Sequence, residues 1–245
     1  CDMLTDKTKS YRAVLLLGQE TDTQDTTGRI LAEAAVKDTP ETEKAVTEAI
    51  YSFKGPYQQI PPMYSALKVN GKKLYELARE GREVERKPRP VEIFDIQIEK
   101  MELPRVVIHV ECSKGTYIRK LCHDIGRKSG CCGCMEGLVR TRAGRFLIED
   151  SLRLSQIEKL RDEGELERYV VPVDGVFEEF PRLEMTAGEG DKLVHNGNPF
   201  ADRLAGGLMV PAARVYDSGG RFIGIYGYDE KKKRYQPQKL FLGGS

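Results

Sequence analysis

The sequence of 245 residues lacks several features that assign a chain to a common class of protein. No apolar run approaches the ~18 residues that a membrane-spanning helix needs. We find no low-complexity tract and no internal repeat of about 20 residues. No glycine-rich loop ending in lysine is present, so nucleotide triphosphate hydrolysis has no support. We therefore expect a cytoplasmic protein that has no membrane partner.

Histidine and cysteine chemistry also has little support. The three histidines, His109, His123 and His195, lie in a predicted strand, a predicted helix and the C-terminal part, with no nucleophile elbow near them. Six cysteines, three of them in the run CCGC at 131–134, without a secretory leader do not form a disulfide pattern. Zinc ligation by these cysteines and His123 is an alternative, but the spacing lacks a paired C-x2-C. We expect reduced thiols and no metal.

Positive charge is concentrated in two segments, although the chain as a whole is nearly neutral at +1. Residues 105–145 carry nine Lys or Arg against three acids, and residues 68–90 carry eight against four. Local basic surfaces on a neutral protein favour a polyanionic partner. Solvated lysines on helix faces explain either segment equally well when it is taken alone.

The order of predicted elements indicates an α+β fold. Residues 10–18, 91–100 and 105–112 alternate between apolar and polar side chains as half-buried strands do. Thr39 followed by Pro40 predicts the start of a helix. We therefore expect a mixed, mostly antiparallel sheet flanked by helices.

Two domains are expected along the chain. The first spans residues 1–175 and includes a proline-punctuated, basic insertion at 55–90, which we interpret either as an arm over a ligand or as a surface insertion. Short strands and glycine turns then predict a small β domain over residues 176–245.

A strand runs directly into a helix at 112–121, which reads CSKGTYIRKL. Apolar residues recur at helical spacing from Ile118 onward, and Thr116 is placed to cap the helix. Arg119 then falls at the third helical position, where the helix dipole disfavours a cation by about 0.3–1 kcal/mol. We therefore expect a carboxylate partner for Arg119.

Four blocks of the chain resemble, in the same order, those of the bacterial tRNA pseudouridine synthase B family, and the tail resembles the small PUA-like domain of that family. The blocks read SYRAVLLLGQETDTQDTTG, QIPPMYSALKVNGKKLYELAREG, CSKGTYIRKLCHDIG and LVRTRAGRF. The resemblance implies isomerisation of uridine 55 in the T loop of tRNA to pseudouridine, without a metal or an organic cofactor. It implies tRNA as the partner, and we expect a monomer.

The resemblance also implies roles for individual residues. Tyr11 matches the active-site tyrosine that stacks on the base and is implicated in removing the C5 proton. Arg119 matches the arginine that pairs with the catalytic aspartate, and Asp25 matches an acid that braces this arginine. Tyr117 matches a further site tyrosine, and Leu138 matches an apolar residue under the base. Lys68 and Arg140 are also expected to contact the substrate.

One departure from the family concerns the nucleophile. The family carries its nucleophilic aspartate in a block like GHTGTLDP, upstream of the Tyr11 strand, and the 245 residues contain no such block. Asp2 and Asp6 do not match it. We therefore expect an N-terminally truncated portion that does not catalyse the reaction alone. The alternative is a non-catalytic protein that binds or folds RNA with the same basic surfaces.

Overall fold

The computed structural model describes residues 8–69 and 71–242. The chain divides into two compact units, residues 1–152 and 153–245. No helix within the described ranges is long and apolar enough to cross a membrane.

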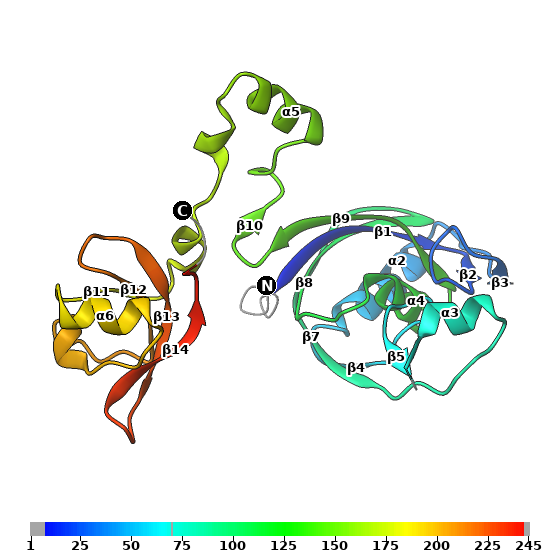
Figure 1. Cartoon of the computed structure of the whole chain (residues 1–245). Coiled ribbons are helices and arrows are strands. Elements are labelled where there is room, and N and C mark those ends of the chain that lie inside the picture. Colours follow the sequence, from blue (N-terminus) through cyan, green and yellow to red (C-terminus); the bar gives the residue numbers. More distant parts are fainter. Residues whose placement is uncertain (1–7, 70, 243–245) are drawn as a thin grey trace. The chain divides into compact units, whose positions relative to one another are not determined.

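Unit 1 is built on a curved six-stranded sheet (Figure 1). Its strands, in spatial order, are β10 (Phe146–Leu147), β9 (Gly133–Ala143), β1 (Lys9–Leu17), β8 (Arg105–Cys112), β7 (Arg89–Glu102) and β4 (Gly55–Gln59). Every neighbouring pair in this order is antiparallel. Two small hairpins accompany the sheet: β2 (Gln19–Thr21) with β3 (Ile30–Glu33), and β5 (Lys68–Val69) with β6 (Lys72–Lys73).

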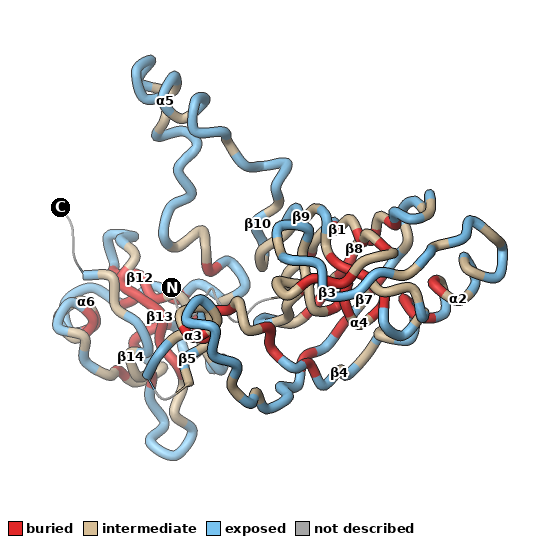
Figure 2. The backbone as a smooth tube through the Cα atoms, turned by 90° about the vertical axis from the view of Figure 1, so that its right-hand side faces the viewer, coloured by how far each residue is buried: buried red, intermediate tan, exposed pale blue. Residues whose placement is uncertain are grey.

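Three helices belong to unit 1: α2 (Pro40–Tyr51), α3 (Leu74–Arg79) and α4 (Ile118–Lys128). The predicted cap of α2 is confirmed, since the Thr39 hydroxyl oxygen accepts a hydrogen bond from the Thr42 N–H at 3.4 Å. The concave face of the sheet holds α2 and α4, and most buried residues lie between them and the strands (Figures 1 and 2). The insertion predicted at 55–90, which we call the arm, contains β4, the β5–β6 hairpin and α3.

The central strand β1 shows how the sequence determines this core. Ala13, Leu15 and Leu17 are almost completely buried and point to the helix-covered face, because side chains two residues apart in a strand share a face. Tyr11 is two residues before Ala13, so its side chain points to the same face, where it is partly buried and packs against the edge of the core. The alternation therefore fixes the side of the sheet on which the Tyr11 side chain lies.

The turn between β8 and α4 differs in detail from the prediction. Gly115 adopts φ +84°, a conformation that favours glycine. Thr116 is not the N-cap, because its hydroxyl donates to the Ser113 carbonyl at 2.8 Å. Tyr117 occupies the N-cap position without a capping side chain, so Arg119 is the second helical residue and not the third.

Unit 2 contains a four-stranded sheet in the order β11 (Arg182–Glu184), β12 (Ala212–Tyr216), β13 (Phe222–Asp229) and β14 (Arg234–Leu240). Its helical elements are α5 (Leu154–Asp162), η1 (Leu166–Tyr169), η2 (Asp174–Phe177), α6 (Glu189–His195) and η3 (Asp202–Ala205). Phe200, Tyr226 and Tyr235 form the aromatic centre of its core. This sheet lies within the range predicted for a small β domain, and α5 contributes no buried residue to it (Figure 2).

Candidate active site

Strands β1 and β9 place three of the predicted site residues on one face of the sheet. Tyr11 lies opposite Arg140, and Ala13 lies opposite Leu138. Directly opposed residues of an antiparallel pair share a face, so Tyr11, Leu138 and Arg140 all belong to the face that α4 also covers. Leu138 is 43% exposed, which leaves an apolar side chain accessible there.

The hydroxyl group of Tyr11 is partly shielded from water. Burial raises its pKa above the ordinary value, and the Arg140 guanidinium beside it acts in the opposite direction. Tyr11 is therefore a neutral phenol at neutral pH, with its ring packed against the edge of the core.

Asp25 lies in the turn between β2 and β3, and this turn is fastened to β9. The Thr26 N–H donates to the Met135 carbonyl, and the Met135 N–H donates to the Gln24 carbonyl, both at 3.0 Å. Gln24 adopts φ 65°, which is uncommon for a residue other than glycine. The backbone around Asp25 is thus held in a specific shape.

The Asp25 carboxylate is surrounded by donors. Its Oδ1 accepts hydrogen bonds from the hydroxyls of Thr23 (2.8 Å) and Thr27 (2.5 Å) and from the Thr27 N–H (3.1 Å). Burial by itself raises the pKa of Asp25, but the bonds from Thr27 and Thr23 and the charge of Arg119 outweigh it, so the net pKa is lowered. Asp25 is therefore ionised at neutral pH.

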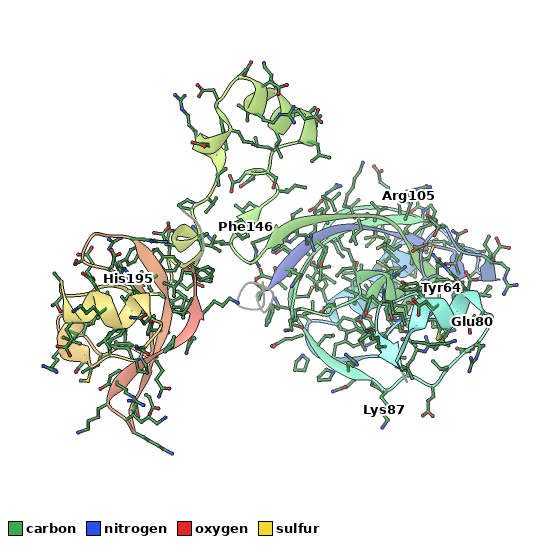
Figure 3. All side chains as sticks on the ribbon, in the orientation of Figure 1. Tyr64, Glu80, Lys87, Arg105, Phe146 and His195 are labelled. Atoms are coloured by element: carbon green, nitrogen blue, oxygen red, sulfur yellow. The ribbon has the colours of Figure 1, made fainter. Side chains whose placement is uncertain are left out.

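Arg119 reaches from α4 to two partners. Its Nη1 lies 3.1 Å from Asp25 Oδ2, and its Nη2 donates to the Tyr64 carbonyl at 2.7 Å. Tyr64 belongs to the arm and lies near α3 (Figure 3). The side chains of Arg119 and Asp25 are only 27% and 16% exposed, so this pair is partly shielded from solvent. The carboxylate partner expected for Arg119 is thus found.

Lys68 is the predicted site residue that lies apart from this group. It is exposed on β5 and borders a hollow of about 250 Å³ that Pro61, Leu74 and Arg86 also line. Neither Arg119 nor Asp25 lines that hollow.

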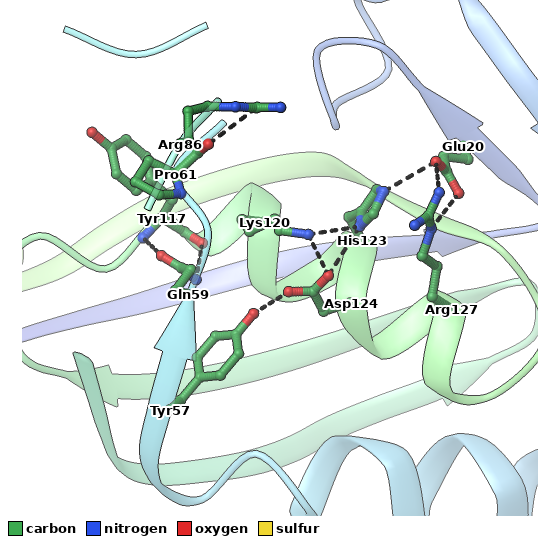
Figure 4. Close-up of polar contacts among 10 residues, drawn as sticks. All are labelled: Glu20, Tyr57, Gln59, Pro61, Arg86, Tyr117, Lys120, His123, Asp124 and Arg127. Carbon is green, nitrogen blue, oxygen red and sulfur yellow. Dashed lines mark hydrogen bonds and ion pairs between the residues drawn. The ribbon is translucent and has the colours of Figure 1, made fainter. Parts of the chain in front are cut away.

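A second group of polar residues, absent from the predicted site, fixes α4 in place (Figure 4). Glu20 of β2 accepts two hydrogen bonds from Arg127, at 2.8 and 3.0 Å, and its Oε1 lies 3.1 Å from His123 Nε2. On the other side of His123, Asp124 interacts with Lys120 and accepts a hydrogen bond from the Tyr57 hydroxyl. These contacts connect α4 both to the hairpin that carries Asp25 and to β4.

A hollow of about 510 Å³ lies beside the Arg119 pair. Gln24 and Tyr64, which neighbour or contact that pair, line it together with cationic residues of the arm, of α4 and of the β2–β3 hairpin. The cationic lining residues are Arg29, Arg82, Arg86, Lys120 and Arg127. The wall also holds Glu20, Asp22 and Glu83, so positive charge exceeds negative charge by two: five cations against three acids.

Residues 8–69 and 71–242 contain no cluster of side chains arranged as a metal site. No three His, Cys, Asp or Glu side chains in these ranges are grouped so as to hold an ion. Cys112, Cys122, Cys131, Cys132 and Cys134 are free thiols. Burial raises the pKa of Cys122 to about 12, so this sulfur is an un-ionised core atom.

Comparison with known families identifies the chain. The family described as "TruB family pseudouridylate synthase (N terminal domain)" matches residues 1–118, and "tRNA pseudouridylate synthase B C-terminal domain" matches residues 119–178. The chain belongs to the TruB family of pseudouridylate synthases. The family resemblance expected from the four sequence blocks is therefore confirmed.

Individual relatives agree with this assignment. The protein named tRNA pseudouridine synthase B from Lachnoclostridium phytofermentans is 46% identical over 256 residues, covering 99% of this chain and 82% of the relative. The protein of the same name from Clostridium kluyveri is 41% identical over 243 residues, covering 98% of this chain and 81% of the relative.

Solved structures show the same fold at low sequence identity. "Crystal Structure of a Cbf5-Nop10-Gar1 Complex" contains a chain with a TM-score of 0.66 and 18% identity, matched over 98% of this chain and 68% of that one. "Structure of H/ACA RNP bound to a substrate RNA containing 2'-deoxyuridine" gives a TM-score of 0.66 at 16% identity, over 99% and 68% of the two chains. The predicted α+β class is confirmed.

Proposed function

We propose that this protein is a tRNA pseudouridine synthase, an isomerase that converts uridine 55 in the T loop of tRNA to pseudouridine. Membership of the TruB family and the names of relatives at 41–46% identity support the class of reaction and of substrate. The structural observation that carries the proposal is the partly shielded guanidinium of Arg119, held by Asp25 and the arm on the face of the sheet that bears Tyr11.

The reaction breaks the bond between N1 of uracil and C1′ of the ribose and forms a bond between C5 and C1′, with loss of a proton from C5 and gain of a proton at N1. A nucleophilic carboxylate in a poorly hydrated site needs a cation that keeps it ionised and oriented. Arg119 is assigned that function. Asp25 is assigned the function of fixing the guanidinium, because hydrogen bonds from Thr23 and Thr27 already occupy its Oδ1.

The target base must leave its stack before its glycosidic bond is accessible. Tyr11 is assigned the aromatic contact with the extruded base and, in the small fraction of molecules in which its hydroxyl is ionised, acceptance of the C5 proton. Leu138 supplies an exposed apolar surface on which the base can lie. Arg140, two residues further along the same face, supplies a cation for the phosphate of that nucleotide. Tyr117 is placed at the start of α4, and Lys68 is assigned a contact between the arm and the RNA backbone.

The nucleophile is assigned to a block like GHTGTLDP that the 245 residues do not contain. Asp2 and Asp6 lie outside the described residues. The carboxylate that Arg119 contacts among the described residues is Asp25. We therefore propose that catalysis requires these residues together with the aspartate block.

Three further properties belong to the proposal. The small β domain within 176–245 is assigned to RNA binding as a PUA-like domain, the protein is assigned to the cytoplasm, and it acts as a monomer on its tRNA. The match to the TruB C-terminal domain ends at residue 178, so it does not extend over the region assigned to the PUA-like domain.

A uridine conversion assay tests the proposed function. Natural full-length protein is incubated with a tRNA transcript, and pseudouridine is mapped by base-specific chemical modification. Conversion at position 55 that depends on Arg119 is the expected result. Salt-dependent binding of the tRNA without conversion would favour the RNA-binding alternative instead.

A further inference from the structure

The root of the arm is joined to the start of α4 by one buried amide. Gln59, the last residue of β4, is 2% exposed. Its Oε1 accepts a hydrogen bond from the Tyr117 N–H at 2.8 Å, and its Nε2 donates to the Tyr117 carbonyl at 3.1 Å (Figure 4). One side chain therefore binds both backbone polar groups of the same residue.

Those two backbone groups define how α4 begins. Tyr117 is the N-cap residue, and its carbonyl also accepts the first bond of the helix, from the Leu121 N–H at 3.1 Å. Neither Tyr117 nor Thr116 caps the helix with a side chain, since the Thr116 hydroxyl bonds to Ser113. Gln59 thus takes the part of a cap supplied from a distant strand.

The same stretch of the arm makes a second contact with the site. Five residues after Gln59, the Tyr64 carbonyl accepts the hydrogen bond from Arg119 Nη2 at 2.7 Å. Arg119 is therefore held from the arm at two points: at the backbone two residues before it, and at its guanidinium. The third point is Asp25, at 3.1 Å from Nη1.

We propose that Gln59 is a positioning residue for Tyr117 and Arg119, which sets the direction in which the Arg119 guanidinium leaves the helix. This inference rests on the proposed function, because it assigns Gln59 to the turnover of the same site. Misplacing a catalytic group by about 1 Å can cost on the order of 10²-fold in rate. A loss of the two bonds to Tyr117 is expected to act on turnover and to leave the RNA-binding surfaces in place.

The neighbouring glutamine provides a matched control. Gln58 lies on β4 directly before Gln59, but it is exposed and points to the opposite face. The variants Gln59→Met and Gln58→Met remove the same amide group and keep a side chain of similar length. Only the first removes the acceptor for the Tyr117 N–H and one of the two donors to the Tyr117 carbonyl, since the Leu121 N–H still donates to that carbonyl.

The test measures kcat, KM for tRNA and tRNA affinity for both variants in the natural full-length protein, at a temperature where thermal melting shows each to be folded. We expect Gln59→Met to lower kcat by about tenfold or more while KM and affinity change less than about twofold. Gln58→Met is expected to match the wild type. If Gln59→Met fails to fold, Gln59→Glu is measured in the same way, since its carboxylate keeps the acceptor for the Tyr117 N–H and loses the donor.

Two results would overturn the inference: an unchanged kcat in the Gln59 variant, or a rise in KM with kcat intact, which would assign Gln59 to the arm and its RNA contacts. A failure of the proposed function is recognised separately, because the wild-type protein itself would then leave uridine unconverted.

Discussion

Replacement of Arg119 by alanine tests the arrangement of the site at its centre. The substitution removes the guanidinium that lies 3.1 Å from Asp25 and 2.7 Å from the Tyr64 carbonyl. Asp25 keeps the bonds from Thr23 and Thr27, whereas the Tyr64 carbonyl loses the bond from Arg119 Nη2. The variant should therefore fold, with a moderate loss of stability.

The magnitudes follow from the number and environment of the bonds. A hydrogen bond to a charged group contributes about 1.5–3 kcal/mol, and partial exposure of this pair places the loss of unfolding free energy at about 2 kcal/mol. Turnover should suffer more, because removing a preorganised electrostatic contact typically lowers kcat by about 10²–10³-fold. Arg119→Lys should lose most of this rate as well, since a single ammonium does not reproduce two diverging N–H donors.

The assay compares kcat and tRNA affinity of natural full-length protein with those of Arg119→Ala and of Arg105→Ala. Arg105 lies on β8, outside the hollow, and also pairs with a carboxylate, that of Glu136, so it is a matched control for charge. We expect Arg105→Ala to retain turnover. A strong loss of tRNA affinity in Arg119→Ala, with kcat preserved, would refute the reasoning and assign Arg119 to phosphate binding.

Three other predictions concern Tyr11, acid stability and helix packing. Tyr11→Phe should lower kcat far more than tRNA affinity, and near-normal turnover in the variant would exclude the proton-transfer role. Turnover of the wild type should rise with pH, because burial raises the pKa of Tyr11 and the ionised fraction of its hydroxyl grows as pH rises. Hydrogen bonds from Arg127 are the main cause of the lowered pKa of Glu20, and the pKa of Asp25 is lowered as well. The stability that these two carboxylates contribute is present above the ordinary carboxyl pKa of about 4, and it is lost as pH falls through their lower folded-state pKa values. Chemical denaturation of Glu20→Gln should therefore show a weaker dependence on pH below about 5 than the wild type, and an identical dependence would contradict this assignment. Gly126→Ala should destabilise the fold by about 2–3 kcal/mol, because the new Cβ would lie 2.3 Å from the Gly133 nitrogen. Gly137→Ala is the control, since its Cβ would lie 3.4 Å from the Val14 side chain. Equal melting temperatures of the two variants would refute the packing argument.

The sequence predicts those parts of the fold that depend on local patterns. Alternation along β1 predicts which side chains enter the core, and Thr39 with Pro40 predicts the start of α2. The carboxylate partner of Arg119 was expected because a cation is disfavoured near a helix N-terminus, and the resemblance indicated Asp25. Only the structure gives their separation of 3.1 Å.

The sequence does not predict contacts made by backbone atoms across long separations. Gln59 and Tyr117 are 58 residues apart, and Arg119 and Tyr64 are 55 apart. Each contact uses backbone N–H or carbonyl groups, which do not distinguish one residue type from another except proline. The prediction that Thr116 caps α4 is wrong for a related reason. A rule based on neighbouring residues does not account for Gln59 of β4, which binds the N-cap residue Tyr117 from a distant strand. The prolines at 61 and 62 indicate an irregular arm without indicating what its root binds.

The most direct test compares the 245-residue chain alone with the same chain joined to a segment that carries an aspartate block like GHTGTLDP, both verified by intact mass, in a pseudouridine assay on T-loop RNA. We expect conversion at uridine 55 when the block is present, and binding of the RNA without conversion when it is absent. Binding without conversion in the presence of the block would contradict the assignment as an isomerase. Conversion by the 245-residue chain alone would show that the nucleophile lies within it.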